Sequence, residues 1–364
     1  MNVQNVVSPF DFRWNLKDGY PAKNIKKHGL KVFSTFACGG GSTMGYKLAG
    51  FDVIAANDID PQMQKVYVAN HNPKQFYLCP VKDLLTKVLP KELYELDVLD
   101  GSPPCSAFSM AGEREKNWGK KKKFREGQSA QVLNDLFFDF IDLVEKLKPK
   151  VVVAENVKGM LQGKAMGYCI MVQQKLHKAG YNVQLFLLNA ATMGVPQVRE
   201  RVFFIATRQD LNLPKIKLIF NFKQIPFMEI SDNDDVVEKV TKKTKEYYEN
   251  APQGKPVGKF DSIVKVNPVK PLQTITATNS SFHSTIARPL NKKELILGGS
   301  FPLDYNFLDC KPNYLIGMSV PPVMMAQIAH QIYNFLINDL CLELLKAFHL
   351  SIRIKFATGF LMKF

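Results

Sequence analysis

The sequence predicts an α/β protein, built on a doubly wound, mostly parallel sheet and carrying a second, smaller domain. Between residues 30 and 206, short apolar runs alternate with amphipathic stretches. This alternation of strand and helix patterns is typical of a parallel sheet with helices on both faces. After residue 207 the periodicity weakens and Lys, Pro, Asn and Asp become frequent, which predicts the second domain. A chain of 364 residues is long enough for two domains.

The expected strands are the apolar runs at 30–36, 53–57, 97–100, 151–155, 183–188 and 201–206. Apolar residues at helical spacing predict a helix over 130–147, and a second helix is expected over 162–180, ending at Gly180. Helical character returns after Pro321 and Pro322 and runs to about residue 340. We therefore expect a larger domain at 1–207 and 312–340, a smaller domain at 208–311, and a tail at 341–364.

Composition excludes several classes of protein. With 46% apolar and 22% charged residues, the chain is not wholly disordered, and no apolar run reaches the ~18 residues that cross a bilayer. Six scattered cysteines without a CxxC pair, and six scattered histidines, predict neither a disulfide framework nor a metal site. The first residues show no signal-peptide pattern, so we expect a cytoplasmic protein. The net charge of +15 favours a nucleic-acid partner, with simple solubility as the alternative.

A glycine cluster, Gly39 to Gly41, follows the first expected strand. Glycines let a backbone approach a ligand closely, and amides at a helix start can bind it. About 20 residues later the second strand runs into Asp58 and Asp60, and an acid at this place can accept hydrogen bonds from ribose hydroxyls. These features predict an adenosine-containing cofactor. The spacing is not GxGxxG, which disfavours a nicotinamide cofactor. The alternative is a tight turn with solvated acids.

The third expected strand leads into a proline-stiffened loop that presents Cys105 at the edge of the sheet where ligands bind. A thiolate at this place would be a strong nucleophile, especially near positive charge. The other five cysteines are expected to be small buried apolar residues. The basic, glycine-containing stretch 113–128 follows. It predicts either a lid that closes over the site and grips phosphates or an ordinary solvated loop.

An acid and two arginines complete the candidate site. Glu155 follows the apolar run 151–154, where burial tends to raise the pKa of a carboxyl group and suits it to a ring nitrogen. The alternative is a capping or salt-bridged acid. Strand alternation would place Arg199 and Arg201 on one face, where they could hold a carboxylate, a phosphate or a base oxygen. The alternative is a strand edge with solvated arginines.

Taken in order, these segments resemble the motifs of the cytosine carbon-5 methyltransferase family over about residues 30–338. Each motif alone is weak, and their shared order is specific. The matching segments are Phe36–Gly41, Asp58, Pro104–Cys105, Glu155–Val157, Gln197–Arg201, Pro271–Thr276 and Gly317–Pro321.

The resemblance implies a Rossmann-like class I methyltransferase that uses S-adenosylmethionine, leaves S-adenosylhomocysteine and needs no metal. Its substrate would be a cytosine flipped out of a short specific sequence of double-stranded DNA. Cys105 would attack carbon 6 and make carbon 5 nucleophilic. Glu155 would bind ring nitrogen 3 and the exocyclic amine, and Arg201, with Arg199, would hold the carbonyl oxygen. Residues 208–270 would form the target recognition region.

The same resemblance implies the binding residues. The expected cofactor contacts are Phe36, Ala37, Gly39, Gly40, Gly41, Asp58, Ile59, Pro80, Val81, Ser102, Pro104, Leu136, Ser319 and Val320. The expected nucleic-acid contacts are Ser106, Ser109, Lys120, Lys121, Lys122, Lys123, Arg125 and Gln197. Four positions depart from the family pattern: Cys38 for Gly, Pro80 for Asp, Ser106 for Gln and Met318 for Asn.

The leading interpretation is a monomeric DNA cytosine methyltransferase of bacterial or phage type, acting at the bacterial nucleoid. It would belong to a restriction-modification system with a cognate restriction endonuclease, or act alone. One alternative is a tRNA cytosine-5 methyltransferase of the related branch. Another, motivated by Pro80 and Met318, is a nucleic-acid-binding protein of this fold with impaired catalysis. The intact set of Cys105, Glu155, Arg199 and Arg201 argues against the second alternative.

Overall fold

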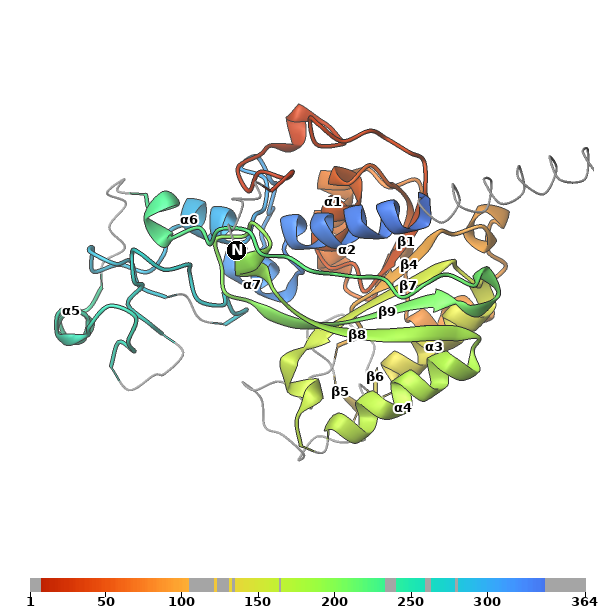
Figure 1. Ribbon diagram of the computed structural model, residues 1–364. Coiled ribbons are helices and arrows are strands. Elements are labelled where there is room, and N and C mark those ends of the chain that lie inside the picture. The colour runs from red at the N-terminus through yellow and green to blue at the C-terminus, as the bar shows by residue number, and fades with distance from the viewer. Residues whose placement is uncertain are drawn as a thin grey trace, which may run out of the picture.

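A seven-stranded sheet with helices on both faces forms the centre of the computed structural model (Figure 1). The structure describes residues 8–104, 121–122, 131–132, 135–163, 165–232, 240–258, 263–278 and 281–337, with the backbone alone at 121–122 and 131–132. In chain order the strands of the sheet are β1 (Lys31–Thr35), β2 (Asp52–Asp58), β3 (Phe76–Leu78), β4 (Val98–Gly101), β7 (Val151–Val157), β8 (Tyr181–Asn189) and β9 (Glu200–Arg208). Their order across the sheet is β3-β2-β1-β4-β7-β9-β8.

The helices are α1 (Gly41–Leu48), α2 (Pro61–His71), α3 (Leu136–Leu147), α4 (Ala165–Lys178), α5 (Lys242–Asn250), α6 (Lys292–Gly298) and α7 (Pro312–Met318). Residues 322–337 are also helical. Short 3-10 turns lie at Leu16–Asp18, Val81–Leu85, Lys91–Tyr94, Lys158–Leu161, Ala190–Thr192, Gln209–Leu211 and Phe227–Glu229. Outside the main sheet, β5 (Lys121–Lys122) pairs antiparallel with β6 (Gln131–Val132).

The predicted α/β fold with a mostly parallel sheet is confirmed. The pairs β1–β2, β1–β4, β2–β3 and β4–β7 are parallel, whereas β9 runs antiparallel to both β7 and β8. The segment 190–199 between β8 and β9 is short, and a parallel pair needs a crossover of a dozen or more residues. The short connection therefore requires β8 and β9 to pair antiparallel.

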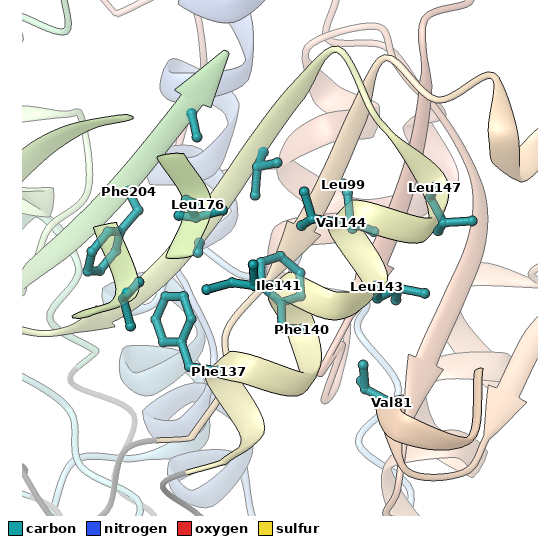
Figure 2. Close-up of a cluster of buried hydrophobic side chains, with 14 of the residues drawn as sticks. Val81, Leu99, Phe137, Phe140, Ile141, Leu143, Val144, Leu147, Leu176 and Phe204 are labelled. Atoms are coloured by element: carbon teal, nitrogen blue, oxygen red, sulfur yellow. The ribbon is translucent and has the colours of Figure 1, made fainter. Parts of the chain in front are cut away.

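One face of the sheet packs on α3 and α4 (Figure 2). The apolar stripe of α3 includes Phe137, Phe140 and Val144, which meet Leu99 of β4 and Phe204 of β9. The rings of Phe137 and Phe204 meet edge to face with centroids 5.2 Å apart. The helical period in the sequence therefore predicted the correct buried face, although α3 begins at Leu136 and residues 131–132 form a strand.

The other face packs on α1 and on the helical residues 322–337 (Figure 1). Tyr46 of α1 shares a buried cluster with Val98 of β4, Val153 of β7 and Met325. A Cβ atom at Gly45 would lie 2.5 Å from the Cβ of Met325. Glycine at this position is therefore what allows α1 and the 322–337 helix to approach.

Besides Ile216 and Leu218, which join the cluster on the α1 face of the sheet, residues 208–311 contribute to two further apolar clusters. One cluster joins Phe227, Ile230 and Leu295 to Met44 and Met63 of the sheet region. The other is small and comprises Tyr248, Ala251, Val257 and Phe282 with a few partly buried neighbours. The predicted division of the chain into domains, with a boundary after residue 207, stays a prediction. Among the described helices, none is both long and apolar enough to span a membrane.

Candidate active site

The glycine loop connects β1 to α1 at the carboxyl edge of the sheet. Its backbone takes left-handed conformations at Phe36, Cys38 and Gly40, with φ of 53°, 47° and 85°. The amide of Cys38 donates a 2.7 Å hydrogen bond to Oδ2 of Asp58, and the amide of Asp60 donates a 2.9 Å bond to Oδ1. Asp58 therefore holds the end of β2 against the loop.

The second acid of this pair has a structural role. Oδ1 of Asp60 accepts hydrogen bonds from the amides of Gln62 and Met63, so Asp60 caps the start of α2. Of the two acids that the sequence offered for the ribose, Asp60 is used to cap a helix, and the ribose role of Asp58 stays a prediction. Burial raises the pKa of Asp58 above its usual value.

The three loop glycines are needed for packing inside the protein. A Cβ atom at Gly39 would lie 2.7 Å from Leu315, one at Gly40 would lie 2.1 Å from His71, and one at Gly41 would lie 2.2 Å from the carbonyl oxygen of Val320. From the sequence alone, the approach of a ligand explains these glycines. The structure adds a second reason, which is close contact with the 315–320 segment and α2.

The 315–320 segment brings Ser319 and Val320 to the glycine loop. Oγ of Ser319 donates to the carbonyl oxygen of Leu315 at 2.8 Å and lies 3.9 Å from Sγ of Cys38. The expected cofactor residues Phe36, Ala37, Gly39, Gly40, Gly41, Asp58, Ser319 and Val320 are thus gathered in one place. The others lie at ends of elements: Ile59 after β2, Pro80 and Val81 after β3, Ser102 and Pro104 after β4, and Leu136 at the start of α3.

Four of the other cysteines can be checked against the expectation that they are small buried apolar residues. Cys79, Cys169 and Cys310 are buried, and Cys38 is half-buried. Burial raises the pKa of the Cys38 thiol to about 12, so the sulfur in the glycine loop stays a neutral thiol.

Glu155 and Arg201 form an ion pair between β7 and β9. Nε of Arg201 lies 2.9 Å from Oε1 of Glu155, and the side chains are 15% and 12% exposed. The antiparallel register of β7 and β9 sets Arg201 opposite Val157 and Glu155 opposite Phe203. The salt-bridged acid that the sequence left as an alternative for Glu155 is what the structure shows, and the pair still reaches the surface.

The prediction that Arg199 contacts the reacting base needs correction. Arg199 is 2% exposed and precedes β9, which begins at Glu200. Its guanidinium donates to the carbonyl oxygens of Ile275 at 3.2 Å, Gly317 at 2.8 Å and Ser319 at 2.9 Å. It therefore fixes two distant segments, and does not share a free face with Arg201.

The prediction that Gln197 contacts nucleic acid is also corrected. Gln197 is fully buried, donates from Nε2 to the carbonyl oxygen of Gly298 at 2.9 Å, and accepts the amide of Ile275 on Oε1 at 2.9 Å. Its side-chain amide is used within the protein and ties segment 196–199 to the chain after Pro271.

Two residues that the sequence analysis passed over contribute to the site. Asn156 donates from Nδ2 to the carbonyl oxygen of Pro103 at 3.2 Å, which fastens the loop after β4 beside the end of β7. Asp100, one residue before the end of β4, is 1% exposed. Asp100 could have been noticed as an acidic residue inside the apolar run 97–100. Asn156 could have been noticed because it directly follows Glu155.

Several predicted residues lie outside the described part of the chain: Cys105, Ser106, Ser109, Lys120, Lys123 and Arg125. Lys121 and Lys122 are described only as the backbone of β5. Their predicted roles stay predictions, and Pro104 is the last described residue before the proposed nucleophile.

A cavity of about 750 Å³ lies elsewhere, between residues 8–24 and 222–229. None of the predicted site residues lines it. The geometry of the strand ends, and not the size of this cavity, therefore locates the candidate site.

Comparison with known proteins agrees with this geometry. The sequence profile described as C-5 cytosine-specific DNA methylase matches residues 30–256. The chain is 35% identical to the Type II methyltransferase M.FnuDI of Fusobacterium nucleatum over 188 residues, which are 50% of this chain and 48% of the relative. It is 32% identical to M.HhaI of Haemophilus parahaemolyticus over 191 residues, 52% of this chain and 53% of the relative. The matched region spans about half the length of these curated relatives.

A longer match joins this chain to the Type II methyltransferase M1.HphI of Haemophilus parahaemolyticus, with 25% identity over 338 residues, 85% of this chain and 88% of the relative. Among solved structures, a prophage-encoded chain from E. coli superposes with a TM-score of 0.67 at 20% identity, covering 85% of this chain and 99% of its own. Spodoptera frugiperda DNMT2 superposes with a TM-score of 0.59 at 18% identity, covering 84% and 100%. These two similarities concern the fold, whereas the profile match covers more than half of the sequence, and the chain belongs to the C-5 cytosine-specific DNA methylase family.

Proposed function

We propose that the chain transfers a methyl group from S-adenosylmethionine to carbon 5 of a flipped-out cytosine in double-stranded DNA, with Cys105 as the nucleophile. The observation that carries the proposal is the hydrogen bond from Asn156 to the carbonyl oxygen of Pro103. It holds the chain two residues before Cys105 beside the Glu155–Arg201 pair. Family membership supplies the reaction type, and this contact supports a common site for the three residues.

The chemistry requires a nucleophile because carbon 5 of cytosine is unreactive. The Cys105 thiolate would bond to carbon 6, and the electron pair of the 5,6 double bond would then be available at carbon 5. Glu155 would hydrogen-bond ring nitrogen 3 and the exocyclic amine, and Arg201 would hold the carbonyl oxygen while charge develops. After methyl transfer, a base removes the carbon-5 proton, the double bond re-forms and the thiolate leaves.

The residues at the glycine loop fit an adenosine-containing methyl donor. Asp58 offers two carboxylate oxygens at the end of β2, both oriented by backbone amides, and this arrangement suits a ribose diol. Pro80 has no side-chain acceptor for an adenine amine, so that contact would be apolar packing. When bound, the donor supplies an electrophilic methyl group. The described residues contain no cluster of three or more side chains suited to a metal ion.

Finer parts of the proposal rest on the relatives. Type II methyltransferases and an orphan methyltransferase of Bacillus phage rho11s are among them. We extend the proposal to a bacterial or phage-encoded monomer that acts at the nucleoid, alone or with a cognate restriction endonuclease. Residues 208–311 would form its target-recognition domain, and the basic stretch 113–128 would contact phosphates.

Conversion sequencing of plasmid from a methylation-free host that expresses the protein tests the proposal. Unconverted cytosines should recur within one short sequence, and expression of Cys105→Ala should leave none. Methyl groups in tRNA but not in plasmid would replace the proposal with the tRNA alternative. If neither polymer is modified and calorimetry shows no heat with S-adenosylmethionine, the chain is a binding protein without this activity.

A further inference from the structure

A cluster of buried polar side chains lies beneath the glycine loop, and Asp100 is at its centre. Oγ of Ser34 donates to Oδ2 of Asp100 at 2.9 Å, and the hydroxyl of Tyr46 donates to Oδ1 at 3.3 Å. Oγ1 of Thr35 donates to the backbone carbonyl oxygen of Asp100 at 2.9 Å. All four side chains are at most 1% exposed, so solvent does not satisfy them.

The cluster connects the two loops of the candidate site. Asp100 pairs with Ser34 of β1, which leads into the glycine loop, while its own strand leads to Pro103 and Cys105. Tyr46 belongs to α1, the helix that begins where the glycine loop ends. The apolar neighbours Val98 and Val153 show that an aliphatic residue would suit this layer of the sheet. A buried carboxyl group costs free energy that its hydrogen bonds offset only in part, and an aliphatic residue would avoid this cost, so this position calls for a role beyond packing.

We propose that Asp100 is a positioning residue that fixes the glycine loop and the loop leading to Cys105 relative to one another. The inference rests on the proposed methyltransferase function. Through Ser34 and Tyr46, the carboxyl group sets the distance between the cofactor loop and the nucleophile loop, without touching substrate or cofactor.

The protonation state of Asp100 gives this role a measurable signature. Burial raises the pKa of Asp100 from 3.8 to about 7, its neighbouring hydroxyls lower it, and the charge of Glu155 raises it further. The facing phenols of Tyr46 and Tyr67 have pKa values raised by burial, so they stay neutral. In the protonated form, Asp100 can donate to a serine hydroxyl oxygen. In the ionised form it places a second negative charge near Glu155.

The sign of the pH effect follows from the raised pKa. The folded state binds the proton more tightly than the unfolded state, so the contribution of this group to stability is full below pH 3.8. It is lost as the pH rises through about 7. Cofactor affinity should fall over the upper part of this range. Asp58 would act in the opposite direction, because its ionised form is the better acceptor for ribose hydroxyls.

Calorimetry with S-adenosylmethionine between pH 5.5 and 8.5 tests the proposal on the full chain. Wild-type affinity should weaken by about fivefold or more across pH 7, whereas Asp100→Asn should lose this decrease and keep only the opposite contribution of Asp58, because the amide resembles the protonated carboxyl group and cannot ionise. Asp100→Ala should bind the cofactor weakly at every pH. The matched control is Asp97→Asn at the opposite end of the strand, where Asp97 accepts from Lys31 and Lys150. It should retain the wild-type pH profile.

Two results would overturn the proposal: an unchanged pH dependence in Asp100→Asn, or wild-type binding and turnover in a folded Asp100→Ala. If the wild type binds no cofactor at any pH, the proposed function fails, and thermal unfolding decides the role of Asp100. Asp100→Asn should then gain melting temperature relative to wild type as the pH rises through 7. Parallel melting profiles would also contradict the inference.

Discussion

Two arginine–glutamate pairs in this protein differ in burial and in connection. Arg288 and Glu294, in the 281–298 region, are 2% and 0% exposed and meet through two bonds of 2.8 and 2.9 Å. Glu155 and Arg201 meet through one contact of 2.9 Å, are 12% and 15% exposed, and lie beside the loop that leads to Cys105. The first pair is buried among further polar partners, including His283 and the backbone of Asp232, and serves the fold. In the proposed function, the second pair would exchange its partner for a base.

Glu294→Ala should have the largest effect on stability. Glu294 also completes a capping box with Asn291 at the start of α6, so its removal takes the buried carboxylate away from Arg288 and uncaps a helix. We expect unfolding free energy to drop by about 3–5 kcal/mol, measured by denaturant titration. A change in unfolding free energy below about 1 kcal/mol, the usual value for exposed pairs, would show that burial does not explain the difference between the two pairs.

Glu155→Gln should change stability little and activity strongly, the reverse of the effect expected for Glu294→Ala. The amide preserves the shape, and Arg201 keeps a hydrogen bond to the carbonyl oxygen of Glu200, so stability should change little. Turnover should fall by about 10²–10³-fold, as for the loss of one group that stabilises developing charge. Single-turnover methyl transfer to duplex DNA measures the rate, and Lys158→Ala serves as a folded control near the same strand. Near wild-type turnover would remove Glu155 from the mechanism.

Arg199 lies between these two cases, because it is buried but bonded to carbonyl oxygens. Arg199→Met should remove three hydrogen bonds to Ile275, Gly317 and Ser319 and cost about 1–3 kcal/mol of stability. Since Ser319 lies at the glycine loop, cofactor affinity should weaken more than the rate of methyl transfer at saturation. Arg199→Lys should recover part of the affinity. A pure rate defect with normal affinity would return Arg199 to the reacting base.

Local patterns in the sequence predicted the fold well, and long-range contacts explain what they missed. Apolar runs located six strands to within a few residues, because buried strands impose their composition on the chain. β3 was not predicted because it has three residues and its side chains are half-buried or exposed. The roles of Gln197 and Arg199 depend on carbonyl groups 76 to 120 residues away, and no spacing rule encodes such partners. Asp58, Glu155 and Arg201 lie at strand ends, where position alone suggested them, but the contact between Glu155 and Arg201 was not predicted.

Lys158 and Glu200 form a third ion pair, which shows how exposure limits such contacts. Their atoms lie 2.8 Å apart, as close as those of Arg288 and Glu294, but the side chains are 45% and 38% exposed. Water and salt screen the attraction, and ordering two long side chains costs entropy. Lys158→Ala should therefore change unfolding free energy by less than about 1 kcal/mol, and added salt should reduce even that difference. A larger loss of unfolding free energy that persists in high salt would mean that distance, and not burial, determines the strength of all three pairs. The contrast between the Arg288 and Arg201 sites would then need another cause.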